Sequence, residues 1–116
     1  MKQISEIRET VNRRAREYGA ERVYLFGSYA RGDYNDSSDI DIMILTDLND
    51  DEIFKYRNKI WEYAYDIEWD NNFDIKLSPL IKNIDKFNYW LEALPFYMNV
   101  QKEGVVLNWA QEYRKN

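Results

Sequence analysis

The chain has 116 residues and a net charge of −5; 45% of the residues are hydrophobic and 32% are charged. This composition is typical of a globular protein, and we expect one domain over residues 1–116. The sequence has no cysteine and no histidine, which excludes disulfides, thiolate chemistry and the commonest general base. The acidic balance also argues against a long nucleic acid as a partner, because such binding depends on Lys and Arg neutralising phosphates.

The sequence gives no sign of a membrane protein or of an exported one. It contains no apolar run of about 18 residues or more, the length that a membrane span requires. Residues Met1–Thr10 carry no secretory signal pattern. Because the absence of cysteine also fits a reducing compartment, we expect a cytoplasmic protein with no membrane partner.

The first half of the chain is predicted to alternate helices and strands. In Ile4–Gly19, apolar residues recur at three- and four-residue steps, which indicates an amphipathic helix that ends at the glycine. Arg22–Phe26 is rich in β-forming residues and predicts a strand, and Ser28–Arg31 can form a short helix. Gly32–Ser38 has turn chemistry throughout. Asp39–Leu45 predicts a second strand, with aspartates on one face and isoleucines on the other.

The second half continues the alternation. A long helix is predicted from Asn49 or Asp50, either of which can cap it, to about Glu68. Phe73–Leu77 predicts a third strand, and Ile84–Leu91 and Pro95–Glu103 predict helices. A last short strand is expected at 105–107. The predicted class is α/β or α+β, with a small mixed sheet flanked by helices.

Gly27 and Ser28 stand where the first predicted strand turns into the short helix. Backbone N–H groups at a helix N-terminus suit a phosphate, and a glycine lets the backbone approach it closely. The serine hydroxyl would add one more hydrogen bond. Because Gly-Ser after a strand is far more often an ordinary turn, the pair indicates a phosphate site only in combination with other residues.

Asp39 and Asp41 lie two positions apart in the predicted second strand, so their carboxylates project from the same face. Two such charges without a counter-ion cost free energy or force one carboxyl to stay protonated. A divalent cation removes the conflict, and Mg²⁺ prefers one or two carboxylates together with phosphate oxygens. The alternative is a half-exposed sheet on which both aspartates face solvent. Asp74 favours the metal site, because a charge in the third predicted strand is out of place unless it faces one.

These motifs resemble the minimal nucleotidyltransferases of the DNA polymerase β superfamily. The resemblance rests on GSYARG at 27–32, SDIDIMI at 38–44 and FDIKL at 73–77, and it extends to the ending LPFYMNVQKEGVVL at 94–107. It implies a polymerase β-like fold, dependence on two Mg²⁺ ions and a nucleoside triphosphate substrate, ATP above all. Two metals between carboxylates and a triphosphate are the arrangement for in-line nucleotidyl transfer.

The resemblance also implies a role for each matching residue. Gly27 and Ser28 would bind the triphosphate, and Asp39 and Asp41 would hold the two metals. Asp74 would ligate the catalytic metal and orient the attacking hydroxyl. Arg31, in the short helix, supports the phosphates or pairs with a nearby carboxylate; the sequence leaves both roles open.

Family members of this length resemble the antitoxin half of two-gene modules, which are encoded beside a helical HEPN toxin. The resemblance implies transfer of AMP to a tyrosine of that toxin, in a hetero-oligomer that completes the acceptor site. Aromatic residues make up 16% of the chain and permit a docking surface, for which we expect exposed rings at Trp90, Phe96, Tyr97 and Trp109.

Three alternatives remain open at this point. A stand-alone enzyme that modifies a small-molecule hydroxyl would use the same site. A non-catalytic antitoxin would act by binding and would tolerate the loss of Asp41. A structural domain with an acidic strand would bind neither Mg²⁺ nor nucleotide, but nothing in folding requires three carboxylates that face inward.

Overall fold

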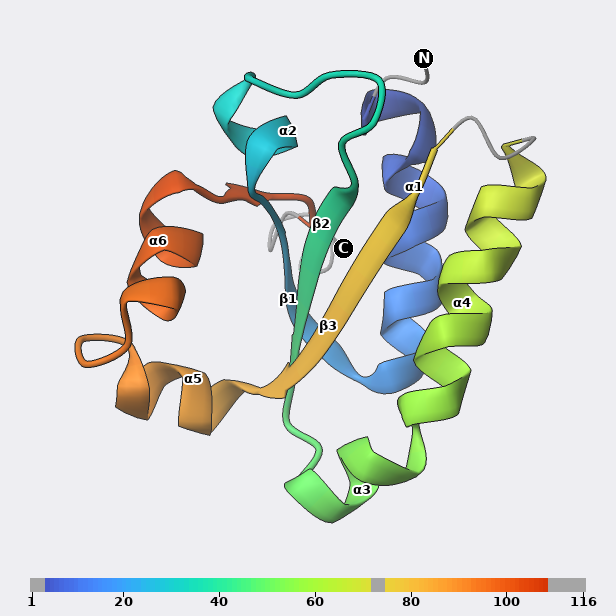
Figure 1. Cartoon of the computed structure of the whole chain (residues 1–116). Coiled ribbons are helices and arrows are strands. Elements are labelled where there is room, and N and C mark those ends of the chain that lie inside the picture. The colour runs from blue at the N-terminus through green and yellow to red at the C-terminus, as the bar shows by residue number, and fades with distance from the viewer. Residues whose placement is uncertain (1–3, 72–74, 109–116) are drawn as a thin grey trace, which may run out of the picture.

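The computed structural model of the chain describes residues 4–71 and 75–108. Figure 1 shows a sheet with helices on both faces. The elements in chain order are α1 (Ile4–Ala15), a 3₁₀ turn (Arg16–Tyr18), β1 (Ala20–Phe26), α2 (Ser28–Arg31), β2 (Ile40–Thr46), α3 (Asp50–Lys55), α4 (Arg57–Asp70), β3 (Leu77–Asn83), α5 (Ile84–Trp90), α6 (Pro95–Glu103) and β4 (Val105–Val106). Apart from the corrections below, these elements agree with the sequence-based predictions to within a few residues.

The four strands form one mixed sheet in the order β3-β2-β1-β4. The central pair, β1 and β2, is antiparallel; β3 runs parallel to β2, and β4 runs antiparallel to β1. This mixed sheet flanked by helices is the architecture that the sequence predicted.

The position of the third strand was predicted wrongly. The sequence indicated Phe73–Leu77, of which Phe73 and Asp74 lie outside the described residues. Of the rest only Leu77 is in a strand, and β3 spans Leu77–Asn83. In β3, buried and half-buried side chains alternate from Leu77 to Ile81. Pro79 lies within the strand and has no N–H to donate, which is tolerated because β3 forms an edge of the sheet.

The predicted long helix is two helices. α3 ends at Lys55 and α4 begins at Arg57, because at Tyr56 the backbone leaves the α-helical region, with φ −93° and ψ 3°. The Tyr56 N–H bonds to the carbonyl oxygen of Ile53 at 3.0 Å. The Tyr56 ring packs edge-on against Tyr18, with ring centroids 5.6 Å apart, so the bend brings this tyrosine onto the core.

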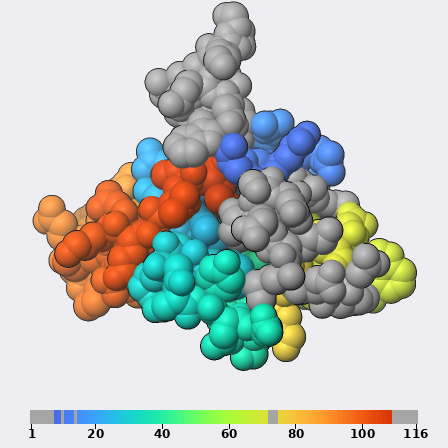
Figure 2. Space-filling model, turned by 90° about the horizontal axis from the view of Figure 1, so that it is seen from above, coloured from blue at the N-terminus to red at the C-terminus, as the bar shows by residue number. Residues whose placement is uncertain are grey.

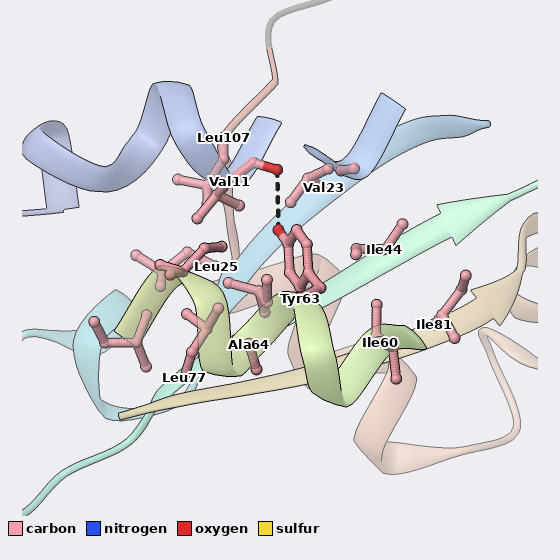
Figure 3. Packing of buried hydrophobic residues seen from close by; sticks show 14 of the residues in the cluster. Val11, Val23, Leu25, Ile44, Ile60, Tyr63, Ala64, Leu77, Ile81 and Leu107 are labelled. Atoms are coloured by element: carbon pink, nitrogen blue, oxygen red, sulfur yellow. Dashed lines mark hydrogen bonds between the residues drawn. The ribbon is translucent and has the colours of Figure 1, made fainter. Parts of the chain in front are cut away.

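Helices α1 and α4 cover one face of the sheet, and α5 and α6 cover the other (Figure 1). Alternate residues of β2 therefore point into different clusters: Ile40, Ile42 and Ile44 pack with α1 and α4, whereas Met43 and Leu45 pack with α5 and α6. On the first face, the Tyr63 hydroxyl of α4 donates a hydrogen bond of 2.9 Å to the carbonyl oxygen of Val11 in α1 (Figure 3). Asp41 belongs to the second face, because residues alternate along a strand.

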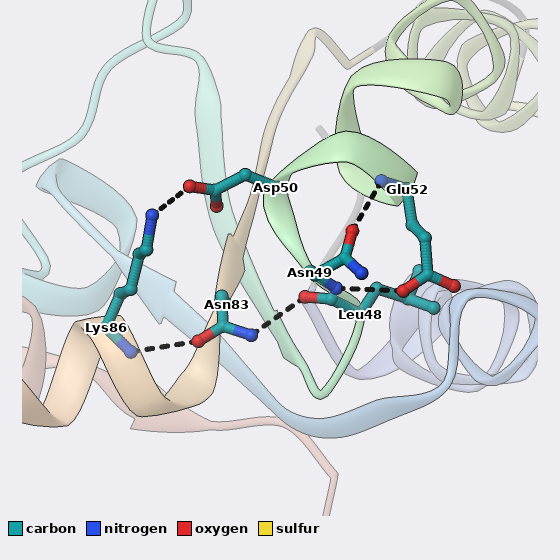
Figure 4. Close-up of polar contacts among 6 residues, drawn as sticks. All are labelled: Leu48, Asn49, Asp50, Glu52, Asn83 and Lys86. Atoms are coloured by element: carbon teal, nitrogen blue, oxygen red, sulfur yellow. Dashed lines mark hydrogen bonds and ion pairs between the residues drawn. The ribbon is translucent and has the colours of Figure 1, made fainter.

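Side-chain caps hold the end of the sheet that lies away from α2. Asn49 and Glu52 form a capping box at the start of α3, and Asn83 caps α5 by accepting a hydrogen bond of 2.9 Å from the N–H of Lys86 (Figure 4). An ion pair between Lys86 and Asp50 joins the two helix starts. This end is a fixed scaffold, and the opposite end carries the predicted site residues. None of the described helices is long and apolar enough to cross a membrane.

Candidate active site

The turn at Gly27 redirects the chain from β1 into α2. Gly27 has φ 74° and ψ −153°, a backbone conformation that side-chain-bearing residues rarely adopt. Its carbonyl oxygen accepts hydrogen bonds of 3.1 Å from the N–H groups of Ala30 and Arg31, which closes the first turn of α2. Ser28 is the first residue of that helix and is half-buried. The Gly-Ser turn that the sequence predicted is therefore present at the end of a strand.

The register of the two central strands places Asp41 beside this turn. Phe26, the last residue of β1, lies opposite Asp41 of β2 in the antiparallel ladder. The carboxylate of Asp41 lies against the α-carbon of Gly27, where a methyl group would collide with it. The absence of a side chain at Gly27 thus leaves the space that the Asp41 carboxylate occupies.

Asp39 is exposed and directly precedes β2. The loop before it is folded by local contacts: the N–H of Asn35 donates a hydrogen bond of 2.9 Å to the Ser38 hydroxyl. The ring of Tyr34 stacks on that of Tyr29 in α2, with ring centroids 4.2 Å apart. These contacts fasten the loop to α2 and bring Asp39 to the same end of the sheet as the Gly27 turn.

The electrostatics of Asp39 and Asp41 agree with the charge repulsion that the sequence led us to expect. Burial raises the pKa of the Asp41 carboxyl above its ordinary value, the charge of Asp39 raises that pKa further, and the guanidinium of Arg31 lowers it. Two carboxylates that repel each other are suitable oxygen ligands for a hard divalent cation. The residues at this end of the sheet therefore fit the expected Mg²⁺.

The third predicted ligand, Asp74, lies outside the described residues. Within residues 4–71 and 75–108, no three acidic side chains come together as a metal-binding group. Of the predicted metal ligands, the structure thus places Asp39 and Asp41, and the role of Asp74 stays a prediction.

Arg31 lines the same site and contacts two carboxylates. Its Nε lies 3.2 Å from Oδ2 of Asp33, and its Nη1 lies 3.7 Å from Oε2 of Glu103 in α6. The guanidinium therefore connects α2 to α6, and its charge also acts on Asp41. Of the two roles that the sequence left open, the structure shows the carboxylate contacts, and a phosphate contact stays a prediction.

Gly27, Ser28, Arg31 and Asp41 open onto a pocket of about 380 Å³. Figure 2 views the molecule from this end and shows α6, in orange-red, beside the segment that leads into β2, in cyan to teal. The rest of the pocket lining comes from the end of β1 and from α6: Phe26, Phe96, Asn99, Val100 and Glu103. Sequence reasoning missed this wall, because a helical pattern does not say which element the helix packs against.

Of the four aromatic residues that we expected to be exposed, the structure describes three. Trp90 and Phe96 are exposed, as expected, but Tyr97 is partly buried and packs on Phe87, with ring centroids 4.9 Å apart. Trp109 lies outside the described residues. Exposed rings also occur on α4, where Trp61 and Trp69 stand two helical turns apart and are each about three-fifths exposed.

Comparison with known proteins agrees with the fold. The family described as "Nucleotidyltransferase domain" matches residues 4–107. The chain belongs to this family. The Gly-Ser turn and the two aspartates lie inside the matched region, and the predicted nucleotidyltransferase fold is confirmed.

A relative from Methanocaldococcus jannaschii carries the name "putative protein adenylyltransferase". It is 31% identical to this chain over 109 residues, which cover 92% of this chain and 99% of the relative. Two solved structures share the fold, each with a TM-score of 0.57. They are the toxin–antitoxin MntA–HpeT, in a variant with two aspartates changed to glutamate, and a toxin–antitoxin with AMP-PNP. Their identities of 20% and 21% extend over 91% of this chain and 76% of each matched chain.

Proposed function

We propose that this nucleotidyltransferase transfers AMP from ATP to a tyrosine hydroxyl of a helical HEPN-type toxin and so acts as its antitoxin. The observation that carries the proposal is the contact between Asp41 and the Gly27 turn. It brings a carboxylate of the predicted metal site and the predicted phosphate-binding turn into one pocket. Membership of the nucleotidyltransferase family supports this assignment of the pocket.

Each site residue predicted from the sequence has a role in the proposal. The Ser28 hydroxyl and the backbone at Gly27 bind triphosphate oxygens, and Arg31 faces the same ligand. Asp39 and Asp41 are the residues that would hold Mg²⁺, with Asp74 as the third ligand. When bound, the metal neutralises phosphate charge and lowers the pKa of the attacking hydroxyl.

The reaction is an in-line displacement at the α-phosphorus of ATP. The tyrosine oxygen forms a bond to that phosphorus, and the bond to the bridging oxygen of pyrophosphate breaks. The hydroxyl proton passes to a carboxylate of the site, so no histidine is needed. The hydroxyl must be held about 3–3.5 Å from the phosphorus, so the acceptor protein docks over the end of the sheet that carries Asp39 and Asp41.

Two comparisons support a protein acceptor. The relative from Methanocaldococcus jannaschii carries the name "putative protein adenylyltransferase", and two solved structures of the same fold are of a toxin–antitoxin. Large exposed aromatic side chains are common anchors at protein interfaces, and this chain carries several, Trp90 and Trp61 among them.

The test combines the protein, MgATP and the helical protein encoded beside it, and weighs that partner by mass spectrometry. The proposal expects a gain of one AMP that disappears with Asp39→Asn and with Asp41→Asn. Asp47→Asn is the matched control, because Asp47 is exposed just after the opposite end of β2 and should leave the gain intact.

Other outcomes separate the alternatives. A partner that stays unmodified but is inhibited equally well by both aspartate variants would show an antitoxin that acts by binding. Turnover of MgATP with small-molecule alcohols in the absence of any partner would indicate the stand-alone enzyme. Either result would contradict transfer to a protein.

A further inference from the structure

Helix α6 presents one face to the pocket. Four of its residues line the cavity, and they follow the spacing of a single helical face: Phe96, Asn99, Val100 and Glu103. Val100 is buried in the core beneath the pocket, so the helix is anchored from below. Pro95 starts the helix, and its fixed φ suits a first-turn position directly before Phe96. The wall is therefore built on regular secondary structure.

The apolar part of the wall is aromatic. Phe96 is 45% exposed although it lines the pocket, and its ring meets Phe26 edge-on, with ring centroids 5.5 Å apart. Phe26 is the residue before Gly27, so this aromatic pair adjoins the Gly-Ser turn directly. An exposed ring held against a second ring offers a flat apolar surface beside the predicted phosphate site.

The pocket therefore has two chemically different sides. Gly27, Ser28 and Arg31 supply hydrogen-bond donors and positive charge beside the carboxylates of Asp41 and Glu103, whereas Phe26 and Phe96 supply aromatic surface. A ligand that fills both sides must have an anionic end joined to a flat apolar one. A volume of about 380 Å³ lies in the range of small-molecule sites. A nucleotide has this two-part character.

We propose that the α6 wall is the nucleoside subsite, in which a purine base stacks on Phe96 and its edge hydrogen-bonds to the side-chain amide of Asn99. The inference rests on the proposed function, which places the triphosphate at Gly27 and Ser28. It assigns the base-binding and base-selecting residues, which the sequence did not indicate.

Asn99 follows Phe96 by three residues on α6, so both side chains reach the same pocket. An asparagine amide carries one acceptor and two donors. It can therefore pair with the N6–H donor and N7 acceptor on the Hoogsteen edge of adenine, where guanine presents two acceptors, O6 and N7. Asn99 accordingly favours ATP over GTP.

The test is calorimetry of the full chain with two probes, MgATP and magnesium tripolyphosphate, which lacks the nucleoside. Phe96→Ala should weaken MgATP binding about five- to hundredfold, the usual range for a lost base stack, and leave tripolyphosphate binding unchanged. Phe96→Leu keeps an apolar side chain and should give a smaller loss of the same kind. Asn99→Leu should reduce the preference for MgATP over MgGTP about tenfold.

Phe54→Ala is the matched control, since Phe54 is an exposed phenylalanine on α3, which lies at the other end of the molecule (Figure 1). It should bind both probes as the unchanged chain does. Ser28→Ala is the converse variant, because it should weaken both probes alike.

The outcomes distinguish a failure of the subsite from a failure of the proposed function. Unchanged MgATP binding in Phe96→Ala and Asn99→Leu would overturn the subsite and leave the proposed function standing. The same holds if these variants lose only transfer to the protein acceptor, which would make α6 part of the acceptor site. If neither probe binds the unchanged chain, the proposed function fails and the subsite falls with it.

Discussion

The carboxylate of Asp41 lies against the α-carbon of Gly27, in a space that any side chain at residue 27 would fill. The contact arises because the β1–β2 register sets Phe26 opposite Asp41. The glycine is thus required twice, for its positive φ and for the room it leaves. This contact joins the predicted phosphate-binding turn to Asp41, one of the predicted metal ligands.

Gly27→Ala should damage both stability and nucleotide binding. The backbone conformation, which is nearly exclusive to glycine, should cost about 1–3 kcal/mol, and the collision with Asp41 should cost a further ~1–3 kcal/mol. Gly32→Ala is the control, since Gly32 has φ 86° and no atom in the way of a methyl group. Urea unfolding should show the larger loss for Gly27→Ala, and calorimetry with MgATP should show lost binding for that variant alone. Equal losses of stability would show that the contact with Asp41 does not matter.

The sequence predicted the parts of the site that depend on local spacing. Gly27 and Ser28 follow a strand directly, and Asp39 and Asp41 lie two residues apart. A short segment of the sequence is therefore enough to predict these site residues. The pocket wall of α6 could not be found in this way, because the approach of Phe96 to Phe26 is a tertiary contact between residues far apart in the sequence.

The misplaced third strand has a different physical cause. Phe73–Leu77 alternates apolar and polar residues as strands do, whereas the segment that follows contains Pro79, a residue that central strands exclude. The structure nevertheless pairs Leu77–Asn83 with β2, because an edge position tolerates the proline and the pairing buries Leu77 and Ile81. Tertiary pairing overrode the local pattern.

Ser28→Ala should weaken binding of the triphosphate without harming the fold. The loss of one hydrogen bond to a phosphate oxygen corresponds to roughly 1 kcal/mol, or somewhat more for a charged acceptor. Calorimetry with magnesium tripolyphosphate measures the effect directly. Thermal unfolding should give an unchanged Tm, because Ser28 is half-buried at the mouth of the pocket. A large fall in Tm would assign this serine a structural role.

Asp41→Asn should stabilise the metal-free protein while abolishing AMP transfer. Burial and the neighbouring charge of Asp39 both raise the pKa of Asp41, so its ionised form is unfavourable in the folded chain. Removing that charge should raise the free energy of unfolding slightly, because water at this half-buried position screens most of the repulsion. Thermal unfolding with and without Mg²⁺ checks the cause, since the cation should raise the Tm of the unchanged chain more than that of the variant. Destabilisation in the absence of metal would contradict the argument.

Glu103→Gln should tighten binding of the triphosphate. The Glu103 carboxylate lines the pocket and lies 3.7 Å from Nη1 of Arg31, so it offsets the positive charge that Arg31 presents to a phosphate. The amide keeps the size of the side chain and removes its charge. This should strengthen tripolyphosphate binding about two- to fivefold, which is the effect of one ion pair at a protein surface. Because the effect is electrostatic and exposed, it should shrink as ionic strength rises and the Debye length falls below about 8 Å. Glu92→Gln, on an exposed residue outside the pocket lining, is the control and should change nothing. A gain that persists at high salt, or weaker binding in Glu103→Gln, would show that this carboxylate contributes to the site in some other way than through Arg31.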